Sequence, residues 1–262
     1  MKNTRKLLLV SVCLVSASLF AQSAFEGTWR FSTQSAKFGG KPYISLLQNG
    51  VYRCDSCVPK IDVKADGKDH ERTGSPYSDA ISVRAVDDRT IETITKKGGK
   101  VVGKSKETVS SDGNTLTNEW SYVGENGQER HGKVLLKRVA PAPEGAHKAS
   151  GSWRPEKVES ASENVLTVTF KVAEDGLSMT QPTGESYTAK FDGKDYPYKG
   201  DPGTTSVSLK KIDANTIEET DKRDGKVIYV ARMTVSSDGR HMKYEGENKL
   251  YGTTDKWEAT KQ

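Results

Sequence analysis

The chain has 262 residues, of which 34% are hydrophobic and 29% are charged, and its formal net charge is +5. Lysines are scattered among acidic residues instead of forming a stripe, so the electrostatic footprint of a nucleic-acid-binding protein is missing. The length suits two domains of about 115 residues, each large enough to bury roughly two-thirds of its unfolded surface.

The N-terminus has the three-part pattern of a secretory signal peptide. Basic residues come first, an apolar stretch runs from Leu7 to Phe20, and small residues follow. This apolar stretch of about fourteen residues is shorter than the roughly 20 that a membrane-spanning helix needs. We therefore predict a signal peptide over residues 1–23. The mature protein is expected to be periplasmic or secreted, with no transmembrane segment and, after the loss of three basic residues, a formal charge of +2.

An internal repeat organises the rest of the chain. DGKD at residues 66–69 recurs at residues 192–195, and TVSSDG at residues 108–113 recurs at residues 234–239, both at an offset of 126. A period of this length indicates duplicated domains rather than short solenoid units. The predicted organisation is a domain over residues 25–139, a Pro/Ala/Gly-rich linker over 140–149, and a second domain over 150–262.

Each copy alternates tight-turn signals with short strand patterns. Asn49-Gly50 and Asp224-Gly225 are typical of hairpin turns, because both positions of such turns need positive φ angles. Between the turns, apolar and polar residues alternate with a period of two, as in Leu116, Trp120 and Tyr122. The fold class is therefore all-β, with an antiparallel meander of about eight or nine strands in each copy. Closing each meander into a barrel removes its exposed edges.

A Gly-x-Trp pattern begins each copy, at Trp29 and Trp153. It resembles the first strand of the lipocalin superfamily, in which the tryptophan plugs one barrel end beneath a cation from the last strand. The resemblance implies that Arg138 covers Trp29, and that Lys256 or Lys261 covers Trp153, as structural pairs. Longer segments, such as DGKDYPYKGDP, are similar to exported bacterial proteins of uncharacterised function, a resemblance that implies no activity.

The pair Cys54 and Cys57 allows three interpretations. A disulfide across a hairpin turn is favoured, because the equivalent residues of the second copy form a turn and the predicted compartment is oxidising. A redox dithiol would normally lie at the start of a helix, and this segment has a strand pattern. Half of a metal site, with His70 as a third ligand, is the remaining alternative.

A ligand site is predicted in the first copy. Gly103, Ser105 and Glu107 occupy the positions of Tyr229, Ala231 and Met233, and lysines on the opposite face suggest that this face points inward. The first barrel would therefore contain less side-chain volume and a buried carboxylate. We expect any ligand cavity to lie there.

Three functions remain open. The preferred one is an exported protein that binds a small apolar or amphipathic molecule inside a barrel. The alternatives are a surface that binds or inhibits another protein, and a hydrolase or isomerase. Acids that recur in both copies, such as Glu92 and Glu218, are weak candidates for acid chemistry. No catalytic residue, cofactor or metal ligand is predicted.

Overall fold

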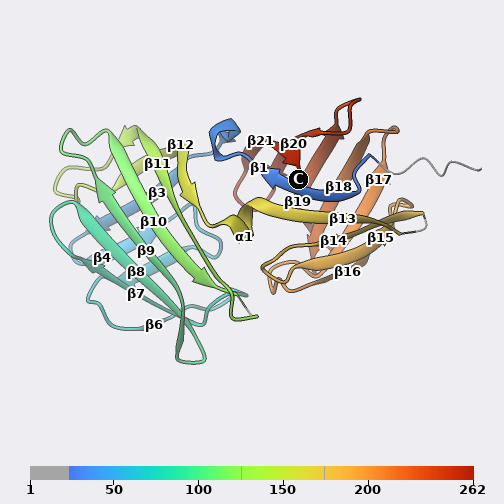
Figure 1. The fold of residues 1–262 in the computed structure, drawn as a ribbon. Coiled ribbons are helices and arrows are strands. Elements are labelled where there is room, and N and C mark those ends of the chain that lie inside the picture. Colours follow the sequence, from blue (N-terminus) through green and yellow to red (C-terminus); the bar gives the residue numbers. More distant parts are fainter. Residues whose placement is uncertain (1–23, 125, 174) are drawn as a thin grey trace, which may run out of the picture.

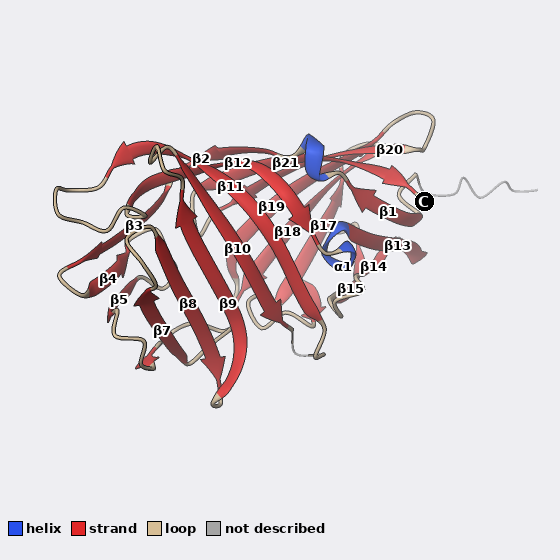
Figure 2. Ribbon diagram, turned by 60° about the vertical axis from the view of Figure 1, so that its left-hand side comes forward, coloured by secondary structure: helices blue, strands red, loops and turns tan. Residues whose placement is uncertain are grey.

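The computed structural model describes residues 24–124, 126–173 and 175–262, and the predicted signal peptide, residues 1–23, lies outside the described residues. Almost all regular structure is strand, as Figure 2 shows, and helical turns occur at η1 (Thr33–Ser35) and α1 (Glu163–Leu166). The prediction of an all-β, antiparallel protein is confirmed. Within the described residues, no helix has the length and apolar character needed to span a bilayer.

Two antiparallel sheets form two barrels that lie side by side (Figure 1). The first barrel consists of ten strands, more than the eight or nine expected. They are β3 (Tyr43–Gln48), β4 (Val51–Cys54), β5 (Ile61–Lys64), β6 (His70–Glu71), β7 (Ala80–Ala85), β8 (Thr90–Lys97), β9 (Lys100–Val109), β10 (Thr115–Val123), β11 (Glu129–Pro141) and β12 (Gly151–Ala161). This barrel is nearly closed, with β5 and β6 as the two edges of its sheet.

The second barrel takes its strands from both ends of the chain. They are β1 (Gly27–Phe31), β2 (Lys37–Gly40), β13 (Thr167–Ala173), β14 (Gly176–Thr180), β15 (Ser186–Lys190), β16 (Tyr196–Lys199), β17 (Ser206–Lys211), β18 (Thr216–Arg223), β19 (Lys226–Val235), β20 (His241–Asn248) and β21 (Thr253–Lys261). Strand β1 pairs with both β13 and β21, which closes a ring of ten strands, and β2 pairs with β21 further along the same edge as β1.

The two copies of the repeat have exchanged their first strands. In Figure 1, β1 lies among the strands of the second barrel, whereas β12, the first strand of the second copy, lies beside β11 and β3 of the first barrel. The division into 25–139 and 150–262 therefore does not match the sheets. Strand β12 follows β11 along the chain, and consecutive strands readily pair as neighbours. This pairing completes the first barrel and leaves β1 to close the second.

The exchange also corrects the predicted tryptophan pairs. Arg138 lies over Trp153, with its guanidinium carbon 4.0 Å from the ring centroid, and Lys261 lies over Trp29, with its Nζ at 4.9 Å. Both tryptophans are completely buried, Trp29 in the core of the second barrel and Trp153 in that of the first. Each pair thus joins a first strand to the last strand of the other copy.

Candidate functional site

The second barrel contains a cavity of about 280 Å³ that is open to the surroundings, here called the second-barrel cavity. Most of its lining residues are apolar or aromatic, from Phe31 on the exchanged strand β1 to Met233 on β19, although polar atoms make up about half of the lining surface. The acidic side chains among its lining residues are those of Glu219, Asp221 and Asp255. An apolar cavity with a few polar groups is the usual form of a small-molecule site.

Two of these acids come from one strand. Ile217 of β18 is 1% exposed in the core of the second barrel, and side chains two and four residues further along a strand share its face. Glu219 and Asp221 therefore point into the barrel. The equivalent residues of the first copy are Thr93 and Thr95, so the acids are particular to the second barrel.

The third acid, Asp255, is held by two hydrogen bonds. Tyr229 Oη donates to its Oδ1 and Trp257 Nε1 to its Oδ2, both at 2.8 Å. Asp255 lies opposite Gly246 in the sheet, where a Cβ would collide with the Tyr229 hydroxyl. Glycine at this position makes room for the Tyr229 ring. Burial raises the pKa of Asp255, although the two hydrogen bonds act in the opposite direction.

Glu219 and Asp221 interact with each other at the cavity wall. Burial raises the pKa of both carboxyl groups, and the charges of Glu219 and Asp201 raise that of Asp221 further. Tyr187 Oη donates a hydrogen bond to Glu219 Oε2 at 2.5 Å. Asp221 Oδ1 has no hydrogen-bond partner and no contact with solvent. Burial and the proximity of the two carboxyl groups therefore both favour the protonated form of the pair.

A second space of about 520 Å³ lies between the barrels. It shares Val165, Gln181 and Tyr198 with the second-barrel cavity, so the two spaces adjoin. Across it, Arg130 of the first barrel forms an ion pair with Glu185 of the second at 2.5 Å, where Glu185 is only 7% exposed. Gln181 thus lies where the second-barrel cavity meets the space between the barrels.

In the predicted site of the first barrel, polar side chains bond to one another. Glu107 does point inward and is 7% exposed, and burial raises its pKa to about 7. Its carboxyl group hydrogen-bonds with Tyr43, whose hydroxyl lies 2.8 Å from that of Tyr52. Ser105 Oγ donates to Asn118 Oδ1 at 2.9 Å. A ligand role for Gly103, Ser105 and Glu107 stays a prediction.

The expectation that any ligand cavity lies in the first copy stays a prediction, but the second barrel also contains a cavity. Tyr229 and Met233, which were expected to fill that barrel, line its cavity instead. The reason is an exchange of large and small residues between neighbouring strands. The first copy has Gly103 where the second has Tyr229, but it has Trp120 where the second has Gly246. Comparing a single strand missed this compensation.

The two cysteines form the predicted disulfide. Cys54 ends β4 and bonds to Cys57 in the turn that leads to β5, so the bond spans a hairpin turn as expected. Cys54 is completely buried in the core of the first barrel. Among the described residues, no group of His, Cys, Asp or Glu side chains is arranged to hold a metal ion.

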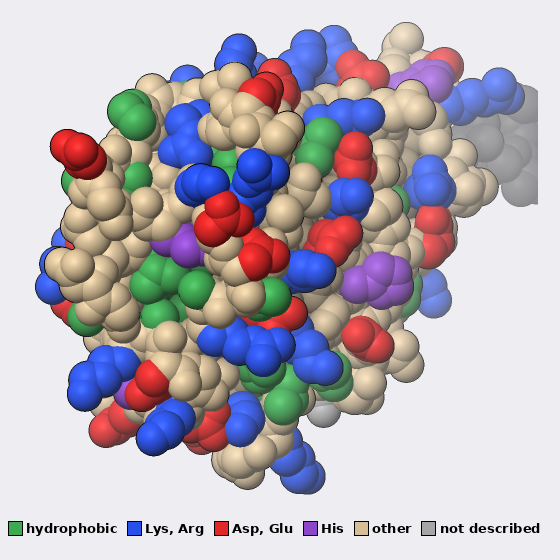
Figure 3. Space-filling model, turned by 90° about the vertical axis from the view of Figure 1, so that its left-hand side faces the viewer, with side chains coloured by type: hydrophobic (Ala, Val, Ile, Leu, Met, Phe, Trp, Pro, Cys, Tyr) green, Lys and Arg blue, Asp and Glu red, His purple; other side chains and the backbone are tan. Residues whose placement is uncertain are grey.

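The acids that recur in both copies face outward. Glu92 pairs with Arg84 at 2.5 Å, and Glu218 with Arg232 at 3.7 Å. On the side of the first barrel seen in Figure 3, acidic and basic side chains are mixed without a continuous area of one sign. These acids therefore contribute to a salt-bridged surface.

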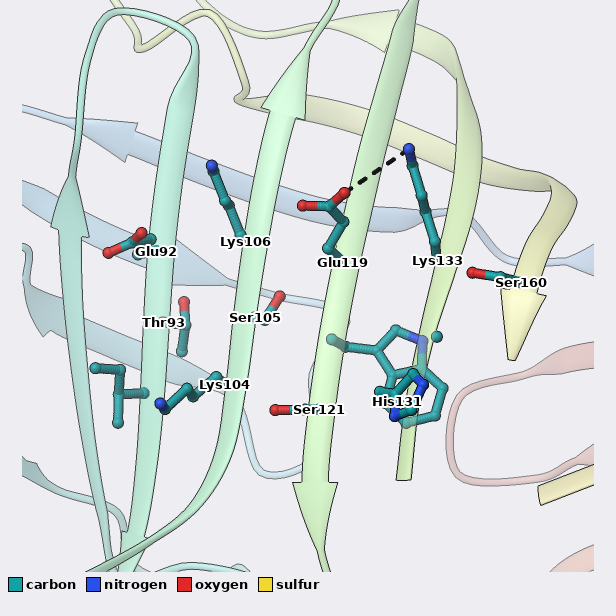
Figure 4. A pocket seen from close by; sticks show the side chains of 13 residues that line it. Glu92, Thr93, Lys104, Ser105, Lys106, Glu119, Ser121, His131, Lys133 and Ser160 are labelled. Carbon is teal, nitrogen blue, oxygen red and sulfur yellow. Dashed lines mark ion pairs between the residues drawn. The ribbon is translucent and has the colours of Figure 1, made fainter. Parts of the chain in front are cut away.

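A further pocket of about 560 Å³ lies on the outer side of β8 to β11 (Figure 4). Charged side chains of both signs surround it, and Lys133 contacts Glu119 at 3.7 Å and Glu159 at 3.2 Å. Its acids and Lys133 form ion pairs, and its other lysines, Lys104 and Lys106, are exposed to solvent, so this pocket buries no unpaired charge that calls for a ligand.

No protein-family model and no curated protein matches this chain. The functional argument therefore depends on the site geometry. The sequence reasoning overlooked Glu219, Asp221 and Asp255. The alternation in β18 was the signal that could have found the first two, because it places them on the same face as Ile217.

Proposed function

We propose that this protein is an exported, lipocalin-like binding protein that holds a small amphipathic molecule in the second-barrel cavity. The observation that carries the proposal is the cavity itself: about 280 Å³ within a closed ring of strands, lined by aromatic and aliphatic side chains together with polar groups. This volume is close to the lower end of typical ligand pockets, roughly 300 Å³, and therefore suits a small ligand.

Export is part of the same proposal. It rests on the signal-peptide pattern in residues 1–23 and is supported by the disulfide, because disulfides persist mainly in oxidising compartments. The lipocalin likeness rests on the Gly-x-Trp strands, each with a cation from a last strand over its tryptophan. In such barrels, the interior holds side chains or one small ligand.

The test is a titration of the full mature chain with 1-aminoanthracene, a neutral aromatic probe whose fluorescence rises in apolar surroundings. We expect saturable binding at one site. Gln181→Trp should weaken it by more than about tenfold, because the larger side chain would occupy part of the cavity that Gln181 lines, at its junction with the other space.

Gln181→Ala is the matched control, since it changes the same position and leaves the junction open. It should bind the probe as the unmodified chain does. Absence of binding to the unmodified chain, or equal binding by all three proteins, would contradict the proposed site. Native mass spectrometry of the exported protein, purified from cells that make it, should also reveal a retained small molecule.

A further inference from the structure

The acids of the second-barrel cavity have no basic counterpart in its wall. Among the described residues that line it, there are three acidic side chains and no Lys, Arg or His. By contrast, the nearby acid Glu185 has an arginine partner from the other barrel. A buried carboxylate is unfavourable unless it is paired, so these acids stay protonated or receive a positive charge from outside the protein.

Asp221 is the acid that the protein leaves available. Both oxygens of Asp255 accept hydrogen bonds from neighbouring side chains, and Glu219 accepts one from Tyr187. Asp221 Oδ1 has no such partner and is shielded from solvent. A buried acceptor without a partner costs free energy. Because Asp221 lines the cavity, a donor on a ligand would recover that cost if the Asp221 side chain turned its Oδ1 toward the cavity.

Aromatic rings complete the surroundings of these acids. Tyr229 and Tyr244 are stacked with their centroids 6.5 Å apart, and Phe31 meets Tyr244 edge-to-face at 5.6 Å. Trp257 also lines the cavity. The face of an aromatic ring attracts a cation, and the same rings provide apolar surface for the body of a ligand.

We propose that the second-barrel cavity binds a small organic cation, a primary ammonium group on an aromatic or short apolar body, with Asp221 as its ion-pair partner. This inference rests on the proposed function, because it names the ligand class of the same cavity. An ammonium group carries three donors and can bond to the Asp221 carboxyl group, after a turn of that side chain toward the cavity, while its body contacts the rings.

The test compares three probes of one size and different charge by calorimetry on the full mature chain: 2-phenylethylammonium, 2-phenylethanol and phenylacetate. We expect the cation to bind about tenfold or more tightly than the alcohol, as one charge-assisted contact would give, and the anion not to bind. Asp221→Asn keeps the shape of the side chain and removes its charge. It should lower the affinity for the cation to that for the alcohol and leave the alcohol unaffected.

Glu107→Gln is the matched control, since it neutralises a buried carboxyl group in the other barrel, and it should bind all three probes normally. If Asp221→Asn does not fold, Asp221→Thr replaces it, because threonine stands at the equivalent position of the first copy (Thr95), and the same loss of preference for the cation is expected. Equal or tighter binding of the alcohol or the anion would overturn the cation class and leave small-molecule binding in place. The cation class is also overturned if 1-aminoanthracene binds and no phenyl probe does. If neither 1-aminoanthracene nor any phenyl probe binds, both the cation class and the proposed function are wrong.

Discussion

The carboxyl groups inside both barrels have raised pKa values, because they are buried without a neighbouring positive charge. In the first barrel, Glu107 lies next to Tyr43 and Tyr52. Its pKa is shifted by burial and by the hydrogen bond with Tyr43, and no positively charged group contributes. Its pKa of about 7, against 4.5 for an ordinary glutamate, means that the folded protein holds a proton that the unfolded chain has already lost between these two pH values.

This shift predicts how Glu107→Gln changes stability with pH. Because the pKa of Glu107 is raised in the folded protein, its carboxyl group does not lower the free energy of unfolding below about pH 4.5. As the pH rises to about 7, it lowers this free energy progressively, and at higher pH the loss is about 3 kcal/mol. Glu107→Gln should therefore match the wild-type free energy of unfolding near pH 4 and exceed it by up to that amount at pH 8. Urea denaturation at several pH values measures the difference.

Glu119→Gln, at an exposed position of β10, is the control and should show no such trend. A difference between Glu107→Gln and the wild type that is the same at pH 4 and pH 8 would show that Glu107 titrates normally in the folded protein.

At the scale of single elements, the hairpin of β4 and β5 shows how little of the fold depends on the disulfide. Cys54 and Cys57 are only three positions apart, so their bond restricts the unfolded chain over a short loop. The first barrel also has a core of its own, in which Ile81, Leu116 and Trp153 are nearly or completely buried. The disulfide secures one turn on a barrel that hydrophobic packing already holds.

We therefore predict that the reduced protein stays folded. A loop of this length corresponds to about 2 kcal/mol of stabilisation, small enough for the barrel to tolerate its loss. Chemical denaturation with and without reductant should show that decrease, with the same strand signal in circular dichroism. Cys57→Ser should behave like the reduced protein and be insensitive to reductant. Unfolding on reduction alone would show that the turn is essential to the barrel.

For the whole molecule, the exchange of first strands decides which parts of the chain can fold. Residues 25–139 contain β1, whose Trp29 is buried in the other barrel, and lack β12, which carries Trp153. Residues 43–161 contain all ten strands of the first barrel without interruption. The first barrel therefore includes residues on both sides of the predicted linker, 140–149, instead of ending at it.

The prediction is that a fragment of residues 41–162 folds alone and a fragment of residues 25–139 does not. Deleting one buried tryptophan side chain costs about 3–5 kcal/mol, and the loss of the whole strand approaches the total stability of a domain. Near-ultraviolet circular dichroism and thermal melting distinguish the two outcomes. Mixing fragments 25–139 and 140–262 should restore a folded complex. Independent, cooperative folding of 25–139 and 150–262 would instead support the simple tandem arrangement.

The sequence by itself determined the local structure and the chemistry of single turns. Period-two alternation and the Asp-Gly and Asn-Gly turns specified strands and hairpins, because both signals depend only on neighbouring residues. The repeat fixed the number of barrels, and the spacing of Cys54 and Cys57 with a turn between them indicated the disulfide. The inward direction of Glu107 also followed from alternation in one strand.

Only the tertiary structure decided which strand closes which barrel and where the cavity lies. Trp29 and Trp153 begin equivalent strands, so their sequences fit either barrel, and the pairing of β12 with the preceding β11 settles the choice. The cavity depends on the sum of side-chain volumes from several strands, as the compensation of Gly103 by Trp120 shows. These volumes can be added only when the register between neighbouring strands is known, and the pattern within one strand does not give that register.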